Sequence, residues 1–125
     1  MSEQKDTQSR AWIFVINNPT DDDKYAVTTV AEQKNVECLI CCEEKGEECG
    51  TLHLQGYVKF KGPVRFSTMK NKLKRGHFKM AKGSPFENYE YCKKIGKHNI
   101  PDEKRIQDGF VCEVGEFPND HKGKR

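Results

Sequence analysis

The fold of this chain is decided by a strand of alternating character, Leu52-His53-Leu54-Gln55-Gly56-Tyr57-Val58-Lys59-Phe60. Successive side chains of a strand point to opposite faces of a sheet. Leu54, Val58 and Phe60 therefore share one apolar face. The other face carries His53, Gln55, Tyr57 and Lys59. The stretch predicts a strand that packs on a core through one face and presents polar groups on the other.

Two strands and a helix are expected before this stretch. Residues 36–44 read as a strand, joined to residues 52–60 by a polar, glycine-containing connection that is typical of a hairpin. Trp12 to Asn17 is rich in β-forming residues and predicts a strand that ends at Asn18-Pro19-Thr20. Thr20 can cap a helix whose first turn is acidic, and this helix is expected to extend to about Lys34.

Four further elements and a polar connection are expected after it. Gly62-Pro63 predicts a break, followed by a short helix capped by Ser67 and a strand over 77–81. Ser84-Pro85-Phe86-Glu87 combines a cap, a proline at the first position and a capping-box glutamate, and predicts a helix to about Lys94. A polar connection over 97–108 then leads to a strand over 109–115. The order β-α-β-β-α-β-α-β predicts one α+β domain with an antiparallel sheet packed by helices.

The composition of the 125 residues fits one soluble domain in a reducing compartment. No apolar run is long enough to span a bilayer, and the N-terminus lacks the apolar core of a signal peptide. The six cysteines include no second Cys-x-x-Cys, and the chain has no histidine pair at zinc-finger spacing. Cys38 and Cys41 are expected to point to opposite faces of their strand, which is poor geometry for binding a metal. We therefore expect buried, reduced thiols and a cytosolic or nuclear location.

The net charge of +3 hides an uneven distribution of charge. Residues 21–48 contain nine acidic and three basic residues, whereas residues 49–86 contain nine basic residues and no acid. Aromatic residues are interleaved with the basic ones. This pattern favours a nucleic acid, whose phosphates pair with the cations and whose bases stack on the rings. A solvated basic face is the alternative.

His53 and Gln55 leave the same face of their strand and form a candidate metal site. If the hairpin register brings Glu44 beside them, a carboxylate, an imidazole and an amide oxygen offer a half-open site for Mg²⁺ or Mn²⁺. Such an ion polarises a phosphate and neutralises its charge. The alternative is that this His-x-Gln pair is structural or incidental.

Tyr91 and Lys94 form a candidate nucleophilic site on the last predicted helix. A tyrosine phenol has an ordinary pKa near 10, so attack on phosphorus needs the phenolate or a base. An ammonium three residues along the helix stabilises the phenolate and the charge that develops on the phosphate. Lys93 is displaced around the helix and is less suited to this role. Plain packing of Tyr91 is the alternative.

Three motifs in this order resemble the nicking domain of replication initiators from small circular single-stranded DNA viruses, most closely the circovirus-like ones. They are Phe14-Val15-Ile16-Asn17-Asn18-Pro19, His53-Leu54-Gln55-Gly56 and Tyr91-Cys92-Lys93-Lys94, with Glu44 where that family places a metal carboxylate. The likeness covers about residues 12–118. Gln55 stands where the wider class of rolling-circle endonucleases has a second histidine, and circovirus-like members share this glutamine.

The resemblance implies an antiparallel five-stranded sheet with flanking helices, a relative of the ferredoxin and RRM folds known as the HUH endonuclease fold. It implies metal-dependent cleavage and joining of single-stranded DNA at a viral origin stem-loop, through a 5′-phosphotyrosine, in the host nucleus. It implies that Tyr91 and Lys94 are catalytic, and that Glu44, His53 and Gln55 hold the ion. The DNA contacts expected from the first motif and the basic block are Asn17, Asn18, Lys59, Lys61, Lys79 and Lys82. A non-catalytic single-strand binder is the alternative.

The same resemblance suggests how the chain is divided. Residues 1–10 are expected to be a flexible N-terminus, residues 11–117 the endonuclease domain, and residues 118–125 a linker toward an absent helicase domain. The chain has no Gly-x-x-x-x-Gly-Lys-Ser/Thr loop, so we expect no ATP site in it. Assembly into an oligomer is expected of the full-length protein.

Overall fold

The computed structural model describes residues 6–46 and 50–119 of the chain. Its elements follow the predicted order, with two short 3-10 turns, Gly96–His98 and Asp102–Lys104, added before the last strand. The strands and helices are β1 (Gln8–Asn17), α1 (Asp21–Ala31), β2 (Val36–Lys45), β3 (Leu52–Arg65), α2 (Phe66–Lys72), β4 (His77–Met80), α3 (Pro85–Lys93) and β5 (Val111–Gly115).

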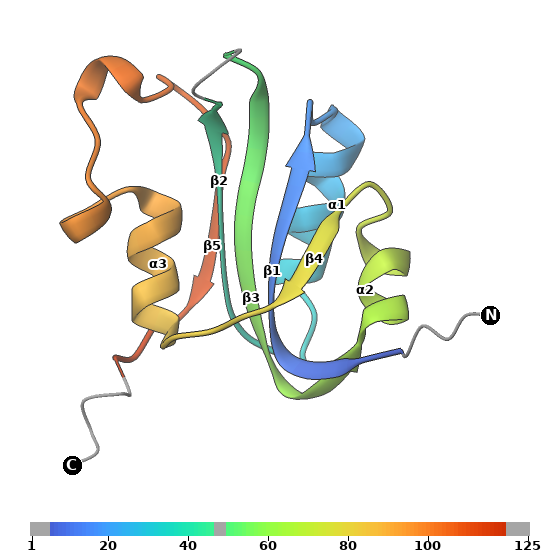
Figure 1. The fold of residues 1–125 in the computed structure, drawn as a ribbon. Coiled ribbons are helices and arrows are strands. Elements are labelled where there is room, and N and C mark those ends of the chain that lie inside the picture. Colours follow the sequence, from blue (N-terminus) through green and yellow to red (C-terminus); the bar gives the residue numbers. More distant parts are fainter. Residues whose placement is uncertain (1–5, 47–49, 120–125) are drawn as a thin grey trace.

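The strands form one five-stranded sheet in the order β4-β1-β3-β2-β5, and each neighbouring pair is antiparallel. Helices α1 and α2 cover one face of this sheet, and α3 lies on the other face (Figure 1). The predicted α+β class with an antiparallel five-stranded sheet is confirmed. Because β3 is the central strand, its His53 and Gln55 lie in the middle of the sheet rather than at an edge.

The two faces of the sheet bury different side chains. The larger core lies under α1 and α2 and contains the apolar residues of β3 together with Trp12 and Phe14 of β1. The smaller core lies under α3 and joins Tyr57 to Cys38, Ile40, Cys42 and Cys92. Cys41 belongs to the larger core, so the prediction that Cys38 and Cys41 point to opposite faces is confirmed. All the cysteines of the described residues are free thiols, and Cys49 lies outside the described residues.

The prediction that Gly62-Pro63 ends the third strand is wrong. β3 continues to Arg65, and its pairing with β1 shifts register between Ala11↔Lys59 and Ser9↔Val64. Proline cannot donate to a strand ladder, but it is tolerated where the ladder is interrupted by a bulge. The extra residues of β3 at this shift include Pro63, so the strand bends here instead of stopping.

The first strand begins earlier than its predicted start at Trp12, and the predicted Ser67 cap is wrong. β1 begins at Gln8, inside the stretch expected to be flexible, while residues 1–5 lie outside the described residues. α2 begins at Phe66 without a side-chain cap. The backbone N–H and the hydroxyl of Ser67 instead donate to the Asp6 carboxylate, at 2.9 Å and 2.7 Å respectively. A contact between residues so far apart in the chain has no local sequence signal.

The predicted helix caps of α1 and α3 are confirmed. Thr20 and Ser84 each form a capping box with the residue three positions later, Asp23 and Glu87. The hairpin between β2 and β3 is also confirmed. The two strands pair antiparallel, and the Gly46 N–H after β2 donates to the carbonyl of Thr51 before β3 at 2.7 Å. Residues 47–49 of this connection and residues 120–125 of the expected linker lie outside the described residues. No helix in the described part of the chain is long and apolar enough to cross a membrane.

Candidate active site

The hairpin places Glu44 directly opposite His53. The two residues are register partners in the β2–β3 ladder, and Glu44 Oε2 lies 2.6 Å from His53 Nε2. Gln55 is the partner of Cys42 and lies on the same face, where it is 6% exposed. The register on which the predicted Glu44, His53 and Gln55 site depends is therefore present.

Lys94 joins this pair to Tyr91. Its ammonium Nζ lies 2.9 Å from Glu44 Oε1, donates to the Tyr91 carbonyl at 2.9 Å and stands 3.7 Å from the centre of the Tyr91 ring. Lys94 is the C-cap of α3 in the left-handed conformation, with φ 56°. The expectation that Lys94 meets Tyr91 along a helical surface is wrong in this detail, because the left-handed cap ends the helix and turns the lysine back over the ring.

The oxygen atoms of Glu44 suit a cation. Oε1 is buried and has no hydrogen-bond partner among the described residues, although it forms the ion pair with Lys94. A buried carboxylate oxygen that accepts no hydrogen bond needs a positive partner, and the Lys94 ammonium supplies it here. No group of three His, Cys, Asp or Glu side chains capable of holding a metal occurs in the described residues, so a closed zinc site is not formed there. A mixed set of carboxylate, imidazole and amide oxygen fits a hard divalent cation instead.

Tyr91 lies on the wall between two cavities. It is 41% exposed, and its ring meets the ring of His98 edge-on with 5.1 Å between centres. One cavity, of about 340 Å³, is lined by Glu44, His53 and Lys94. The other is the larger cleft described next. Tyr91 and His98 line both, so the tyrosine hydroxyl is within the reach of a ligand that extends from one cavity into the other.

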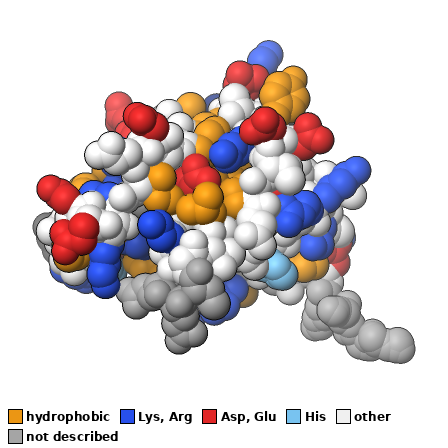
Figure 2. All heavy atoms as spheres, turned by 90° about the horizontal axis from the view of Figure 1, so that it is seen from above, with side chains coloured by type: hydrophobic (Ala, Val, Ile, Leu, Met, Phe, Trp, Pro, Cys, Tyr) orange, Lys and Arg blue, Asp and Glu red, His pale blue; other side chains and the backbone are white. Residues whose placement is uncertain are grey.

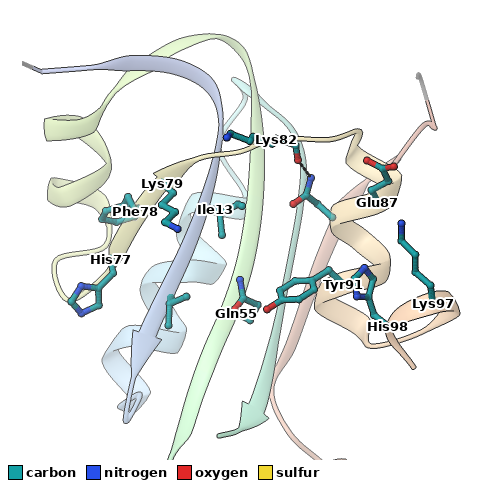
Figure 3. A pocket seen from close by; sticks show the side chains of 12 residues that line it. Ile13, Gln55, His77, Phe78, Lys79, Lys82, Glu87, Tyr91, Lys97 and His98 are labelled. Atoms are coloured by element: carbon teal, nitrogen blue, oxygen red, sulfur yellow. Dashed lines mark hydrogen bonds between the residues drawn. The ribbon is translucent and has the colours of Figure 1, made fainter. Parts of the chain in front are cut away.

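The larger cleft has a volume of about 680 Å³ and a mainly basic rim. Its floor is the part of the sheet that α3 leaves open, including Ile13 of β1 and Lys79 of β4 (Figure 3). Its far wall is formed by α3 and the turn after it. Asn88 of α3 donates to the Lys82 carbonyl at 2.9 Å and so fixes the segment that enters the helix. Such a cleft suits an extended anion with flat, apolar parts.

The structure separates the four lysines predicted to bind DNA into two pairs. Lys79 and Lys82 line the cleft beside Tyr91. Lys59 and Lys61 lie toward the other end of β3, and Lys59 pairs with Glu37 at 3.6 Å. Six residues of strand separate Lys59 from His53, which is about 20 Å at 3.3 Å per residue. Of these four lysines, only the first pair lines the cleft that Tyr91 also lines.

Asn17 and Asn18 lie at the end of β1 that faces this site, and Asn17 is the register partner of His53. Their carbonyls accept hydrogen bonds from Arg75, at 2.9 Å and 3.4 Å respectively, and Arg75 also pairs with Asp23. Burial raises the pKa of Asp23, but the hydrogen bonds from Thr20 and Arg75 and the charge of Arg75 lower it by more. The pKa of Asp23 is therefore below its usual value. Arg75 therefore holds the turn that ends β1.

Several basic residues of the charged block have partners within the protein. Lys72 donates to Gln33 at 2.6 Å, and Lys70 donates to the carbonyls of Lys74 and Gly76. Seen from above, toward the end of the sheet where β1 and β2 finish, acidic and basic side chains are interspersed (Figure 2). The basic residues of the 49–86 stretch therefore do not form a single patch on that face. The lysines that this stretch contributes to the cleft are Lys79 of β4 and Lys82 in the segment after it.

Two residues of the site were missed by the sequence reasoning. His98 packs against Tyr91, and Arg105 donates to the carbonyls of Lys93, at 3.1 Å, and of Lys94, and to Asn99 Oδ1, at 2.8 Å. Both belong to the stretch that was expected to be a polar connection. A histidine or arginine in such a stretch carries no periodic signal, so only the folded arrangement reveals its role.

An α+β domain with a His-x-Gln pair on the central strand of a five-stranded antiparallel sheet, and a tyrosine on the helix beside it, has the arrangement of the HUH endonuclease fold. The sequence profile of the family of viral replication proteins matches residues 9–95. The chain belongs to this family.

Relatives of the chain come from several viruses and an alphasatellite. It is 41% identical over 120 residues to the replication-associated protein of beak and feather disease virus, an alignment that covers 91% of this chain and 41% of the relative. It is 38% identical over 86 residues to the replication-associated protein of canary circovirus, covering 69% of the chain and 29% of the relative. It is 31% identical over 87 residues to Para-Rep C1 of the Faba bean necrotic yellows C11 alphasatellite, covering 69% and 31%. The chain thus spans less than half the length of these relatives.

Proposed function

We propose that the chain is a metal-dependent domain that nicks and joins single-stranded DNA at a viral origin stem-loop, in the host nucleus, and so starts rolling-circle replication. The observation that carries the proposal is the position of Tyr91, which lines both the cavity of Glu44 and His53 and the basic cleft of Lys79 and Lys82. A DNA strand in the cleft brings a phosphate to the hydroxyl of Tyr91. The family to which the chain belongs supports the same reading.

In the proposed reaction the Tyr91 hydroxyl oxygen attacks the phosphorus of the scissile phosphate. A bond forms between Tyr91 Oη and phosphorus, and the bond between phosphorus and the 3′ oxygen breaks. Tyr91 loses its phenol proton and carries the 5′-phosphate on its oxygen. The departing 3′ oxygen gains a proton and becomes a hydroxyl. Since one phosphodiester replaces another, attack by a 3′-hydroxyl on the phosphotyrosine reverses the step and joins ends without ATP.

The residues around Tyr91 divide the work of this step. Lys94, 3.7 Å from the ring centre, stabilises the negative charge that develops on the phosphate. His98 and Lys94 together fix the position of the ring. Glu44, His53 and Gln55 would hold Mg²⁺ or Mn²⁺, which would polarise the phosphate and neutralise its charge.

The test is the search for a covalent adduct. The chain is incubated with Mn²⁺ and a library of single-stranded oligonucleotides that carry a randomised stretch, and a slower protein band is sought on a denaturing gel. We expect an adduct with the wild type and none with Tyr91→Phe. Tyr89→Phe is the matched control, because Tyr89 lies on the same helix but its hydroxyl donates to Glu113. An adduct that persists in Tyr91→Phe refutes the nucleophile. DNA binding without any adduct supports the non-catalytic binder instead.

A further inference from the structure

Glu44 meets a nitrogen atom at each of its two carboxylate oxygens. His53 Nε2 lies 2.6 Å from Oε2, and Lys94 Nζ lies 2.9 Å from Oε1. All three side chains are largely shielded from solvent, since Glu44 and Lys94 are each 17% exposed and His53 is 20% exposed. The carboxylate that would hold a metal ion is therefore already engaged by an ammonium group.

An ammonium and a divalent cation cannot share one carboxylate oxygen at contact distance. Two charges of like sign at contact distance repel strongly in the surroundings typical of a protein surface, and the repulsion doubles when one charge is divalent. Lys94 has to leave Glu44 Oε1 before that oxygen can bind a cation. The cost of breaking the pair then reduces the affinity of the site for the metal.

Lys94 has a second place to go. Its Nζ already donates to the Tyr91 carbonyl at 2.9 Å and stands over the Tyr91 ring. Its backbone is fixed by Arg105, which donates to the carbonyls of Lys93 and Lys94. The side chain can therefore turn away from Glu44 and stay beside Tyr91 while the chain around it does not move.

We propose that Lys94 and the divalent cation exchange at Glu44. Lys94 occupies the carboxylate in the metal-free protein, and it is released to the Tyr91 ring when the site is loaded. This inference rests on the metal site of the proposed function. Its consequence is that the ammonium reaches full availability for Tyr91 only when the metal is in place, so nucleophile and metal are coupled through one lysine.

The experiment measures the affinity for Mn²⁺ without DNA, by the electron paramagnetic resonance signal of free Mn²⁺. Lys94→Gln and Lys94→Gly both remove the ammonium, and glycine also favours the left-handed cap, so this variant keeps α3 intact. We expect both to bind Mn²⁺ about tenfold more tightly than the wild type. Lys93→Gln is the matched control, because it removes the adjacent positive charge, which pairs with Glu113 instead, and should change the affinity less than twofold.

The outcomes separate this inference from the metal site itself. Glu44→Gln should abolish binding in every background. If the wild type binds Mn²⁺ through Glu44 but the Lys94 variants match Lys93→Gln, the exchange is refuted and the metal site stands. If neither the wild type nor the Lys94 variants bind, the metal site is refuted and the exchange with it. Tighter binding by both Lys94 variants than by the wild type and Lys93→Gln supports both. In the wild type, Mg²⁺ should shift the side-chain NMR signals of Lys94 more than those of Lys93.

Discussion

Gly56 ends the His-Leu-Gln-Gly motif, and the structure gives it a packing role that is open to a sharp test. Gly56 is the register partner of Phe14, whose ring is fully buried and lies across the glycine. A Cβ added at Gly56 would overlap this ring, with Phe14 Cε2 at only 2.6 Å. Alanine in a strand is otherwise favoured over glycine by about 0.5–1 kcal/mol. The local preference and the packing therefore predict opposite signs for Gly56→Ala.

The packing term should win. Overpacking a tight core costs about 1–3 kcal/mol, and the Phe14 ring has no solvent-exposed position into which it can turn. We expect Gly56→Ala to lower the free energy of unfolding by about 2 kcal/mol, or the Tm by roughly 6–10 °C for a domain of this size. Urea unfolding followed by the fluorescence of Trp12 measures it, because Trp12 is the single tryptophan and is 2% exposed in the same core.

Gly62→Ala is the matched control for this substitution. Gly62 lies in the same strand, and a Cβ there meets nothing within 4 Å. It should leave the free energy of unfolding unchanged or raise it by at most about 1 kcal/mol, because only the backbone preference for alanine acts there. In Phe14→Leu the smaller side chain makes room, so Gly56→Ala should cost at least 1 kcal/mol less in that background than in the wild type. Equal stability of the Gly56→Ala and Gly62→Ala proteins would refute the reasoning.

Three other predictions concern the charged and thiol groups. Arg105→Ala should lower the free energy of unfolding by about 1–3 kcal/mol in urea, since it leaves carbonyls at the end of α3, including that of Lys94, without their charged donor. Arg75→Ala should cost about 1–2 kcal/mol in the same assay, because it frees the turn that ends β1 and leaves a nearly buried carboxylate unpaired. Burial raises the pKa of Cys38 and of Cys42 from 9.0 to about 11, so unfolded thiols lose their protons first and stability should fall as pH rises from 9 to 11. A double alanine variant of these cysteines should show a weaker fall, and an unchanged pH dependence would contradict the assignment.

The sequence was sufficient for the sheet, because each of its signals is local. Alternation places the residues of β3 on the correct faces, and the hairpin signal sets the register that joins Glu44 to His53. The errors arise where a distant segment intervenes. Pro63 stays inside β3 because the β1 pairing is interrupted there, and Ser67 does not cap α2 because Asp6 from the N-terminus takes its hydrogen bonds. Contacts of this kind depend on the complete fold and leave no pattern in a window of sequence.

The same distinction applies to the site. His53 and Gln55 lie on one strand whose period is 2, so their common face follows from spacing alone, and the hairpin register adds Glu44 from the neighbouring strand. The lysines predicted to touch DNA came from composition, and composition does not say which end of a strand a lysine occupies. Lys79 and Lys82 therefore lie at the cleft while Lys59 and Lys61 do not. His98 and Arg105 depend on the path of an irregular segment, which no periodicity describes.

The spacing of Tyr91 and Lys94 has a different physical meaning from the one that a helical surface suggests. On a regular helix, residues three apart lie side by side and both side chains point outward. Here α3 ends at Lys93, and Lys94 adopts the left-handed conformation that reverses the chain direction. This reversal lets one ammonium contact the ring of Tyr91 and the carboxylate of Glu44 on a neighbouring strand. The tyrosine must therefore lie in the last turn and the lysine just beyond it, so the Tyr-x-x-Lys spacing is set by the end of the helix.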